Sequence, residues 1–169
     1  SIKVSKKVRK WWGSCRESYF HDPTTIDLFF KKLLARRIAP AEPLLFLDIG
    51  ANTGSYCLLT VLDPYLECVA YEPNKEVYEI LCENIDLNAL KGRLIAYNIG
   101  LWNEDVQRDL KIPLDCADSG LSTLGDNTAR FIYGDKSGDF KTVNIECRKL
   151  DTHLEKICLN KKVDAIKID

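Results

Sequence analysis

The stretch "LLFLDIGANTGSY", Leu44–Tyr56, decides the fold of this chain. It begins as a run of large apolar residues, which is typical of a strand buried inside a sheet. The run then passes Asp48 and turns through Gly50 and Gly54. Apolar residues resume after the turn, so we expect a helix over about 53–62. A buried strand, a glycine turn and a helix in this order indicate an α/β fold.

The rest of the chain continues the alternation of strands and helices. Further strands are expected at 66–73, 93–98 and 163–169, and helices at 24–37, 74–90 and 151–159, with N-caps at Thr24 or Thr25, Asn74 and Asp151. This order predicts a parallel sheet with helices on both faces. Segments 106–113 and 141–150 alternate between apolar and polar residues, the first like an antiparallel edge strand, and a long loop is expected between them.

The composition is typical of one soluble globular domain. The chain has 169 residues, of which 46% are apolar and 29% charged, and it contains no run of 18 apolar residues. Residues 1–40 hold ten Lys/Arg against three acids, whereas residues 41–169 hold fourteen against twenty-two. We therefore divide the chain into a basic lead and helix, 1–43, and a cofactor-binding body, 44–169. The body is too acidic for a nucleic-acid-binding core.

The cysteines and histidines argue against a disulfide framework and a metal site. Seven cysteines include no CxxC pair, and most lie in apolar patterns, such as Cys57 and Cys68. This usage is typical of core residues in a reducing, cytoplasmic protein. No metal site is predicted, because His21 and His153 have no partner at ligand spacing.

The glycine turn and its neighbouring acids indicate a nucleotide-type ligand site. Such a turn brings backbone N–H groups and a helix N-terminus close to a ligand. Glu72 ends the next strand, 22 residues after Gly50. There its carboxylate can accept hydrogen bonds from two ribose hydroxyls. The alternative is that the two glycines only make a tight turn and that Glu72 is a surface acid.

The residues of the turn favour S-adenosylmethionine (SAM) over NAD. The dinucleotide fingerprint G-x-G-x-x-G, started at Gly50, requires glycines where this chain has Asn52 and Ser55. Asp48 would repel a pyrophosphate at the turn. SAM has no phosphate and carries a sulfonium and an ammonium group, so a carboxylate at the turn suits it.

Five segments together resemble the FkbM-type SAM-dependent methyltransferases. They are "FLDIGANTGSY", "VAYEPN", "LSTL", "KLDTHLE" and "DAIKID", and the resemblance runs from about Leu44 to the last residue. It implies a Rossmann-like class I methyltransferase fold with SAM as cofactor. It also implies methylation of a hydroxyl group on a sugar or natural product, so that the partner is a small-molecule or glycan acceptor.

The resemblance assigns roles to residues at the turn and at the ends of the following strands. It places around the amino-acid part of SAM the residues Asp48, Gly50, Ala51, Asn52, Gly54 and Ser55. It gives Glu72 the ribose hydroxyls, Pro73 the shape of the adenine side and Leu101 a border with adenine. Trp102 and Asn103 depart from the small residue and Asp that the family usually has there. "SGLSTL", 119–124, matches a serine-containing family segment near the site.

Methyl transfer to a hydroxyl requires a group that positions the acceptor oxygen or removes its proton. Asp169, which matches the first acid of the family's "DVEG", is the candidate catalytic residue. The alternative is that it holds the SAM ammonium or orients a loop. His153 is less favoured, because its helix should lie away from the turn. Two other functions stay open, namely a SAM-binding module without turnover and an NAD-dependent oxidoreductase.

The two ends of the sequence carry further expectations. A class I sheet has strands beyond the four expected here, so we expect the natural chain to continue past Asp169. The strand 163–169 would otherwise be an aggregation-prone edge. At the start, Val4, Val8, Trp11 and Trp12 fall on one face of a helix whose other positions are mostly Lys and Arg. Residues 1–12 therefore predict either peripheral membrane contact or packing of the tryptophans on the body.

Overall fold

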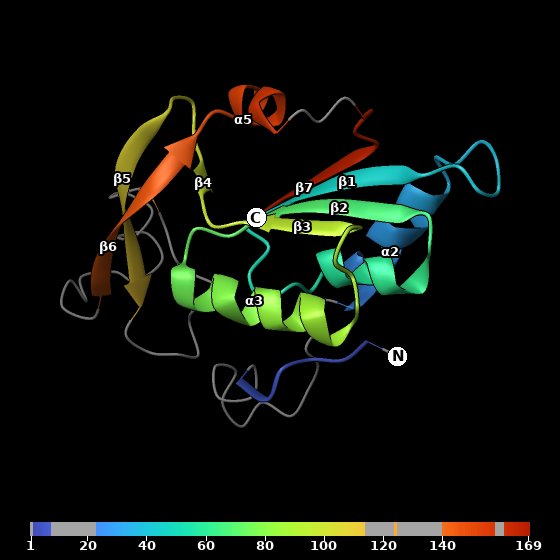
Figure 1. The fold of residues 1–169 in the computed structure, drawn as a ribbon, viewed down its shortest axis with the longest axis horizontal. Coiled ribbons are helices and arrows are strands. Elements are labelled where there is room, and N and C mark those ends of the chain that lie inside the picture. Colours follow the sequence, from blue (N-terminus) through green and yellow to red (C-terminus); the bar gives the residue numbers. More distant parts are fainter. Residues whose placement is uncertain (1, 8–22, 114–123, 125–139, 158–160) are drawn as a thin grey trace.

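A four-stranded parallel sheet, sheet A, forms the centre of the computed structural model, which describes residues 2–7, 23–113, 124, 140–157 and 161–169 (Figure 1). Its strands are β1 (Leu44–Ile49), β2 (Leu66–Tyr71), β3 (Leu94–Tyr97) and β7 (Ala165–Ile168), in the spatial order β3-β2-β1-β7. Every neighbouring pair is parallel. The predicted parallel sheet is thereby confirmed.

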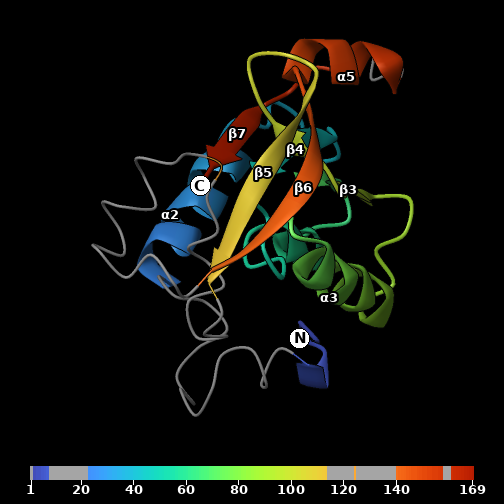
Figure 2. The ribbon, with the colours of Figure 1, turned by 90° about the vertical axis from the view of Figure 1, so that its left-hand side faces the viewer.

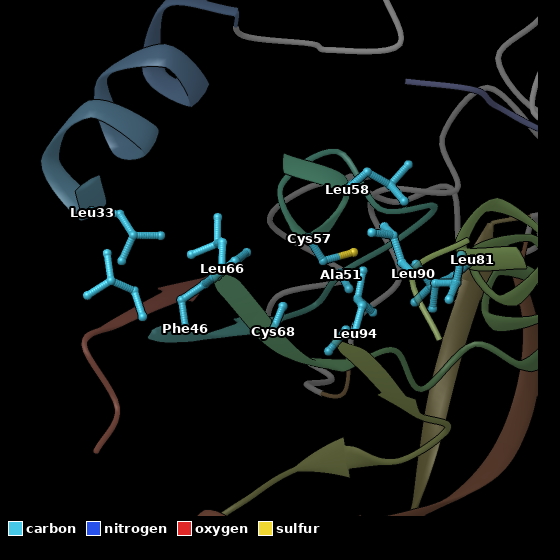
Figure 3. Packing of buried hydrophobic residues seen from close by; sticks show 13 residues of the cluster. Leu33, Phe46, Ala51, Cys57, Leu58, Leu66, Cys68, Leu81, Leu90 and Leu94 are labelled. Atoms are coloured by element: carbon cyan, nitrogen blue, oxygen red, sulfur yellow. The ribbon is translucent and has the colours of Figure 1, made fainter. Parts of the chain in front are cut away.

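Helices cover both faces of sheet A, as predicted. One face carries α2 (Pro23–Leu34), the 3-10 helix η1 (Cys57–Leu62) and α3 (Lys75–Leu87), and the other carries α5 (Leu150–Lys156). The first face holds a core built from Phe46 and Cys68 of the sheet with Leu33, Leu58 and Leu81 of the helices (Figure 3). Because β1 has helices on both sides, its first five residues are all buried, which explains its unbroken apolar run.

A second, three-stranded sheet, sheet B, lies in front of the carboxyl ends of sheet A (Figure 2). It contains β4 (Gly100–Leu101), β5 (Val106–Pro113) and β6 (Phe140–Arg148), in the order β4-β6-β5. β5 and β6 pair antiparallel, with Leu110 opposite Val143, and β5 is an edge strand. The two predicted alternating strands are confirmed, whereas β4 was not expected. Most of the predicted loop between them, and the segment 119–123, lie outside the described residues.

Three helix starts differ from prediction. The chain turns over 52–56 and becomes helical only at Cys57, because Asn52 and Gly54 have positive φ angles of 50° and 108°, which an α-helix does not accept.

Helix α2 begins at Pro23, whose fixed φ suits a first helical position, so Thr24 and Thr25 are not N-caps. Helix α5 has Lys149 as its N-cap, so Asp151 lies in the first turn. The Asn74 cap of α3 is confirmed, since its side chain accepts a hydrogen bond from the Glu76 N–H.

The predicted N-terminal amphipathic helix is wrong at its start. Residues 2–5 are not helical, and Ser5 is buried against α3. The other positions of the proposed apolar face, Val8, Trp11 and Trp12, lie outside the described residues, so membrane contact stays a prediction. Among the residues that the structure describes, no helix has the length and apolar character needed to cross a membrane.

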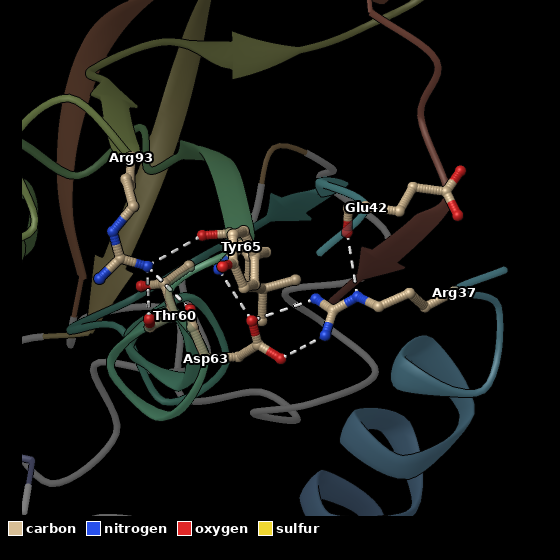
Figure 4. A network of polar contacts seen from close by, with 7 residues as sticks. Arg37, Glu42, Thr60, Asp63, Tyr65 and Arg93 are labelled. Atoms are coloured by element: carbon tan, nitrogen blue, oxygen red, sulfur yellow. Dashed lines mark hydrogen bonds and ion pairs between the residues drawn. The ribbon is translucent and has the colours of Figure 1, made fainter. Parts of the chain in front are cut away.

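An arginine–aspartate pair fixes the far end of sheet A, where α2 ends and β2 begins (Figure 4). Arg37 donates two hydrogen bonds to the Asp63 carboxylate, at 2.6 and 3.1 Å, and one to the Glu42 carbonyl at 3.0 Å. The Arg37 guanidinium lowers the pKa of Asp63. Arg93 donates to three backbone carbonyls around the end of η1, those of Thr60, Asp63 and Leu66. The bonds to Thr60 and Asp63 satisfy carbonyls that the end of η1 leaves unpaired.

Candidate cofactor site

The glycine turn after β1 folds back onto the end of β2. The N–H groups of Gly50 and Ala51 both donate to the Tyr71 carbonyl, at 3.0 and 2.9 Å. Gly50 has a φ of 71°, and a Cβ atom there would lie 3.0 Å from the Cβ of Asp169. A Cβ atom at Gly54 would lie 3.0 Å from Leu81 Cδ1. Both positions therefore require glycine, for the backbone conformation and for the close approach.

Glu72 is the acid that the turn and β2 bring together. Its Oε2 accepts the Asn52 N–H and its Oε1 accepts the Asn74 N–H, both at 2.8 Å. The side chain is only 6% exposed, so the alternative that Glu72 is a surface acid is wrong. Burial raises the pKa of Glu72 to about 7, although the two N–H donors and Lys167 oppose that shift.

Asn98 holds the peptide that follows Glu72, and our sequence analysis did not single it out. Its Nδ2 donates to the carbonyls of Glu72 and Pro73, at 2.8 and 3.0 Å. The feature of the sequence that could have indicated Asn98 is a polar residue directly after the third strand, in "YNIG". Leu101 lies in β4 and packs against the apolar cluster that contains Tyr71. Its expected contact with adenine stays a prediction.

Asp48 lies beneath the turn, where Lys167 neutralises it. Its Oδ2 accepts the Cys57 N–H at 3.0 Å, and its Oδ1 lies 3.2 Å from Lys167 Nζ. Lys167 also lies 3.3 Å from the Asp169 carboxylate and donates to the Gly50 carbonyl at 2.9 Å. Burial raises the pKa of Asp48 and lowers that of Lys167, but the two carboxylates leave the pKa of Lys167 above its usual value.

Burial limits the contacts that Asp48 makes in this conformation. The side chain is fully buried, so in this conformation it cannot touch a ligand directly. It is a positioning residue, because it binds the first N–H of η1 and the lysine that holds the Gly50 carbonyl. Lys167 was missed by the sequence analysis. The feature of the sequence that could have indicated Lys167 is a charged residue inside the apolar run "AIKI".

The other predicted residues of the turn differ in exposure. Ala51 and Gly54 are buried, whereas Asn52 and Ser55 are half-buried. Asp169 is the most open of the site residues, with its side chain 70% exposed. Its N–H donates to the Ile49 carbonyl at 3.1 Å, which places it at the carboxyl end of β7 beside the turn, as predicted.

His153 lies in α5, on the face of sheet A opposite to α2, η1 and α3. Its ring packs edge-on against Tyr71 and Tyr97, with centroid distances of 5.5 and 4.6 Å, and only 8% of it is exposed. Burial lowers its pKa. A buried ring among aromatic side chains is placed for packing.

A cavity of about 460 Å³ lies beside Pro73 and Asn74, the residues that follow Glu72, between the first turn of α3 and sheet B. Pro73, Asn74 and Asn98 line one side, and both polar and apolar side chains of β5 and β6, among them Gln107, Asn144 and Leu110, line the other. The buried Nδ2 of Asn74 has no hydrogen-bond partner among the described residues. An unpartnered buried donor beside a cavity is what a ligand with hydrogen-bond acceptors would satisfy.

Comparison with known protein families decides what kind of domain this is. The family described as Methyltransferase FkbM domain matches residues 48–169. The chain belongs to the FkbM methyltransferase family. The matched range contains the glycine turn, Glu72, the cavity lining and β7. A comparison with curated proteins gives no match.

Several solved structures resemble parts of the chain. TYW2 from P. horikoshii, in complex with MeSAdo, is 25% identical over 42% of this chain and 26% of its own, with a TM-score of 0.33. The C-terminal domain of precorrin-6Y C5,15-methyltransferase from Rhodobacter capsulatus is 26% identical over 45% and 38%, with a TM-score of 0.35. StiE O-MT is 15% identical over 59% and 36%, with a TM-score of 0.38. Each of these three matches covers well under half of the solved chain, and the low TM-scores carry no conclusion about the acceptor.

The residues present fit SAM, the cofactor that the family implies. Glu72 presents a carboxylate at the end of β2, and Asn74 an unpaired donor beside it. Around the turn the acids Asp48, Glu72 and Asp169 outnumber Lys167, the one base that pairs with them among the described residues. An excess of negative charge favours a cationic ligand and disfavours a pyrophosphate.

Proposed function

We propose that this FkbM-family chain is a SAM-dependent O-methyltransferase that methylates a hydroxyl group on a sugar or natural-product acceptor. The observation that carries the proposal is Glu72. Its carboxylate is buried beside a glycine turn, and two backbone N–H groups fix both of its oxygens in place. A ligand with a vicinal diol, such as a ribose, satisfies the lone pairs that remain.

Each residue of the site has a separate part in this proposal. Bound SAM would supply an electrophilic methyl group on its sulfonium. Glu72 and Asn74 would hold the nucleoside side, while Asp48 and Lys167 would keep the turn in shape from below. Asp169 would position the acceptor hydroxyl or accept its proton, because it is an exposed carboxylate at the carboxyl end of β7.

The cavity supports an acceptor or ligand rich in hydroxyl groups. Its lining combines amide side chains with two lysines, two glutamates and several apolar residues, so it has no large excess of either charge. Such a surface offers donors and acceptors to a neutral polar molecule and lacks the basic character that a phosphate-rich nucleic acid would require. The sugar or natural-product acceptor, a cytoplasmic location and membrane contact through residues 1–12 are likewise part of this proposal.

Binding measurements separate the proposal from its rivals. Calorimetry with S-adenosylhomocysteine (SAH) and with NADH should give heat only for SAH, and Glu72→Ala should weaken SAH binding at least tenfold, because it removes charged hydrogen bonds. Binding of NADH in place of SAH would establish the oxidoreductase alternative. If SAH binds but no hydroxyl acceptor receives a labelled methyl group, the chain is a binding module without turnover.

A further inference from the structure

Asn84 joins the cofactor turn to the N-terminal segment of the chain. It lies in α3 and is fully buried. Its Nδ2 donates to the Thr53 carbonyl in the turn at 2.8 Å, and its Oδ1 accepts the Ser5 N–H at 2.6 Å. Both partners are backbone groups of fixed polarity, so the orientation of the amide is determined. One side chain therefore forms hydrogen bonds with backbone groups of two segments that are 48 residues apart in sequence.

The segment Ile2–Lys7 is docked on α3 by more than this bond. Asn88, one helical turn after Asn84, accepts the Lys3 N–H at 2.8 Å and donates to the Lys3 carbonyl at 2.7 Å. Ser5 Oγ donates to Glu83 at 2.7 Å, and Ile2 packs against the core of that face. The two asparagines thus bind the backbone of the segment much as a neighbouring strand would.

The far side of Asn84 leads directly to the cofactor site. Thr53, whose carbonyl Asn84 holds, donates its N–H to Asn52 Oδ1 at 2.7 Å. Asn52 has a positive φ and donates its own N–H to Glu72. A continuous series of hydrogen bonds therefore runs from Ser5 through Asn84 and the turn to Glu72.

We propose that docking of residues 2–5 on α3 positions the cofactor turn through Asn84, so that docking and cofactor binding favour each other. This inference rests on the proposed SAM binding. When the segment leaves, Asn84 Oδ1 loses a buried partner, which costs free energy unless the amide reorients or water reaches it. Either change weakens its hold on the Thr53 carbonyl. Coupling between two sites is reciprocal, so a bound cofactor must also strengthen docking.

The test compares Ser5→Pro with Ser5→Ala in the full chain. Proline removes the N–H that Asn84 accepts, whereas alanine keeps that N–H and removes only the hydroxyl bonds. We expect Ser5→Pro to weaken SAH binding about fivefold or more, the lower end of typical coupling. Ser5→Ala also removes the part-buried bond from Ser5 Oγ to Glu83, so it should weaken SAH binding as well, but less than Ser5→Pro does. Asn88→Ala, which loosens docking without touching the turn, should resemble Ser5→Pro.

Amide hydrogen exchange provides a second readout that does not depend on the ligand. In protein without SAH, the amides of residues 52–56 should exchange faster in Ser5→Pro than in Ser5→Ala. Added SAH should slow exchange of the Ser5 amide in the unmutated chain. Equal SAH affinity and equal exchange in the two Ser5 variants would overturn the coupling. Failure of the unmutated chain to bind SAH would instead overturn the proposed function, while the exchange comparison would still decide whether docking positions the turn.

Discussion

SAH binding should weaken sharply as the pH falls from 8 to 6, because Glu72 must be ionised to accept two ribose hydroxyls. The carboxyl group is buried against the turn, and that burial raises its pKa to about 7 in the protein without ligand. An ordinary glutamate, with a pKa near 4.3, would stay ionised over the whole range and give no such dependence.

The expected size of the effect follows from the fraction of Glu72 that is ionised. With a pKa of about 7, roughly one tenth of the molecules carry the carboxylate at pH 6 and roughly nine tenths at pH 8. If only the carboxylate form binds, the affinity should be about tenfold lower at pH 6 than at pH 8. The sign is fixed, since protonation removes acceptors and cannot strengthen a bond to a hydroxyl donor.

Calorimetry at pH 6, 7 and 8 measures this dependence, with Glu72→Gln as the matched control. Glutamine keeps the shape and one acceptor oxygen but does not titrate, so its weaker binding should be nearly independent of pH. Any dependence that it retains reports titration elsewhere in the protein or in SAH. An unmutated chain whose affinity is as flat as that of Glu72→Gln would refute the reasoning, because the carboxyl group would then be ionised throughout or uninvolved.

Three further changes test the framework of the site. Lys167→Met leaves the Asp48 carboxylate buried without its cation and should lower the free energy of unfolding by about 3 kcal/mol in urea denaturation. The double variant Lys167→Met/Asp48→Asn should recover most of this lost stability. If the effects of the two substitutions on the free energy of unfolding simply add, the pairing is contradicted. Arg37→Met should cost about 2 kcal/mol at pH 7, since both members of the pair are mostly buried. Arg37 lowers the pKa of Asp63, so the stability that the pair contributes is fully present above the pKa of the unfolded aspartate, near 3.9. It should disappear as the pH falls through the lower pKa that Asp63 has in the folded protein. If Arg37→Met still destabilises the protein in acid, the loss is one of packing. Ile168 is 72% exposed on the edge strand β7, so Ile168→Lys should reduce self-association in light scattering, and a chain that is monomeric without the change would count against an adhesive edge.

Local patterns predicted most of the framework. The apolar run at Leu44–Ile49 and the cap at Asn74 each depend on residues close in sequence, and both are confirmed. Local patterns failed at helix starts, where the φ angles of the glycine turn delay η1 until Cys57.

The sequence also placed Glu72 and Asp169 at the carboxyl ends of strands, since those positions depend only on where each strand stops. It could not show what those side chains would meet. The pairing of Asp48 with Lys167 spans 119 positions, and Asn84 bonds to Ser5 across 79. No periodicity records such distances, because each side chain finds its partner only after the strands and helices have packed.

The sequence by itself thus determined the parallel sheet, the glycine turn and the acid at the end of β2. The tertiary structure alone decided that Asp48 supports the turn from beneath it and that the N-terminal segment reaches the turn through Asn84. The physical reason is burial. A charge or amide taken out of water must find a partner of complementary polarity, and the partners available are those that folding brings close, however distant they are along the chain.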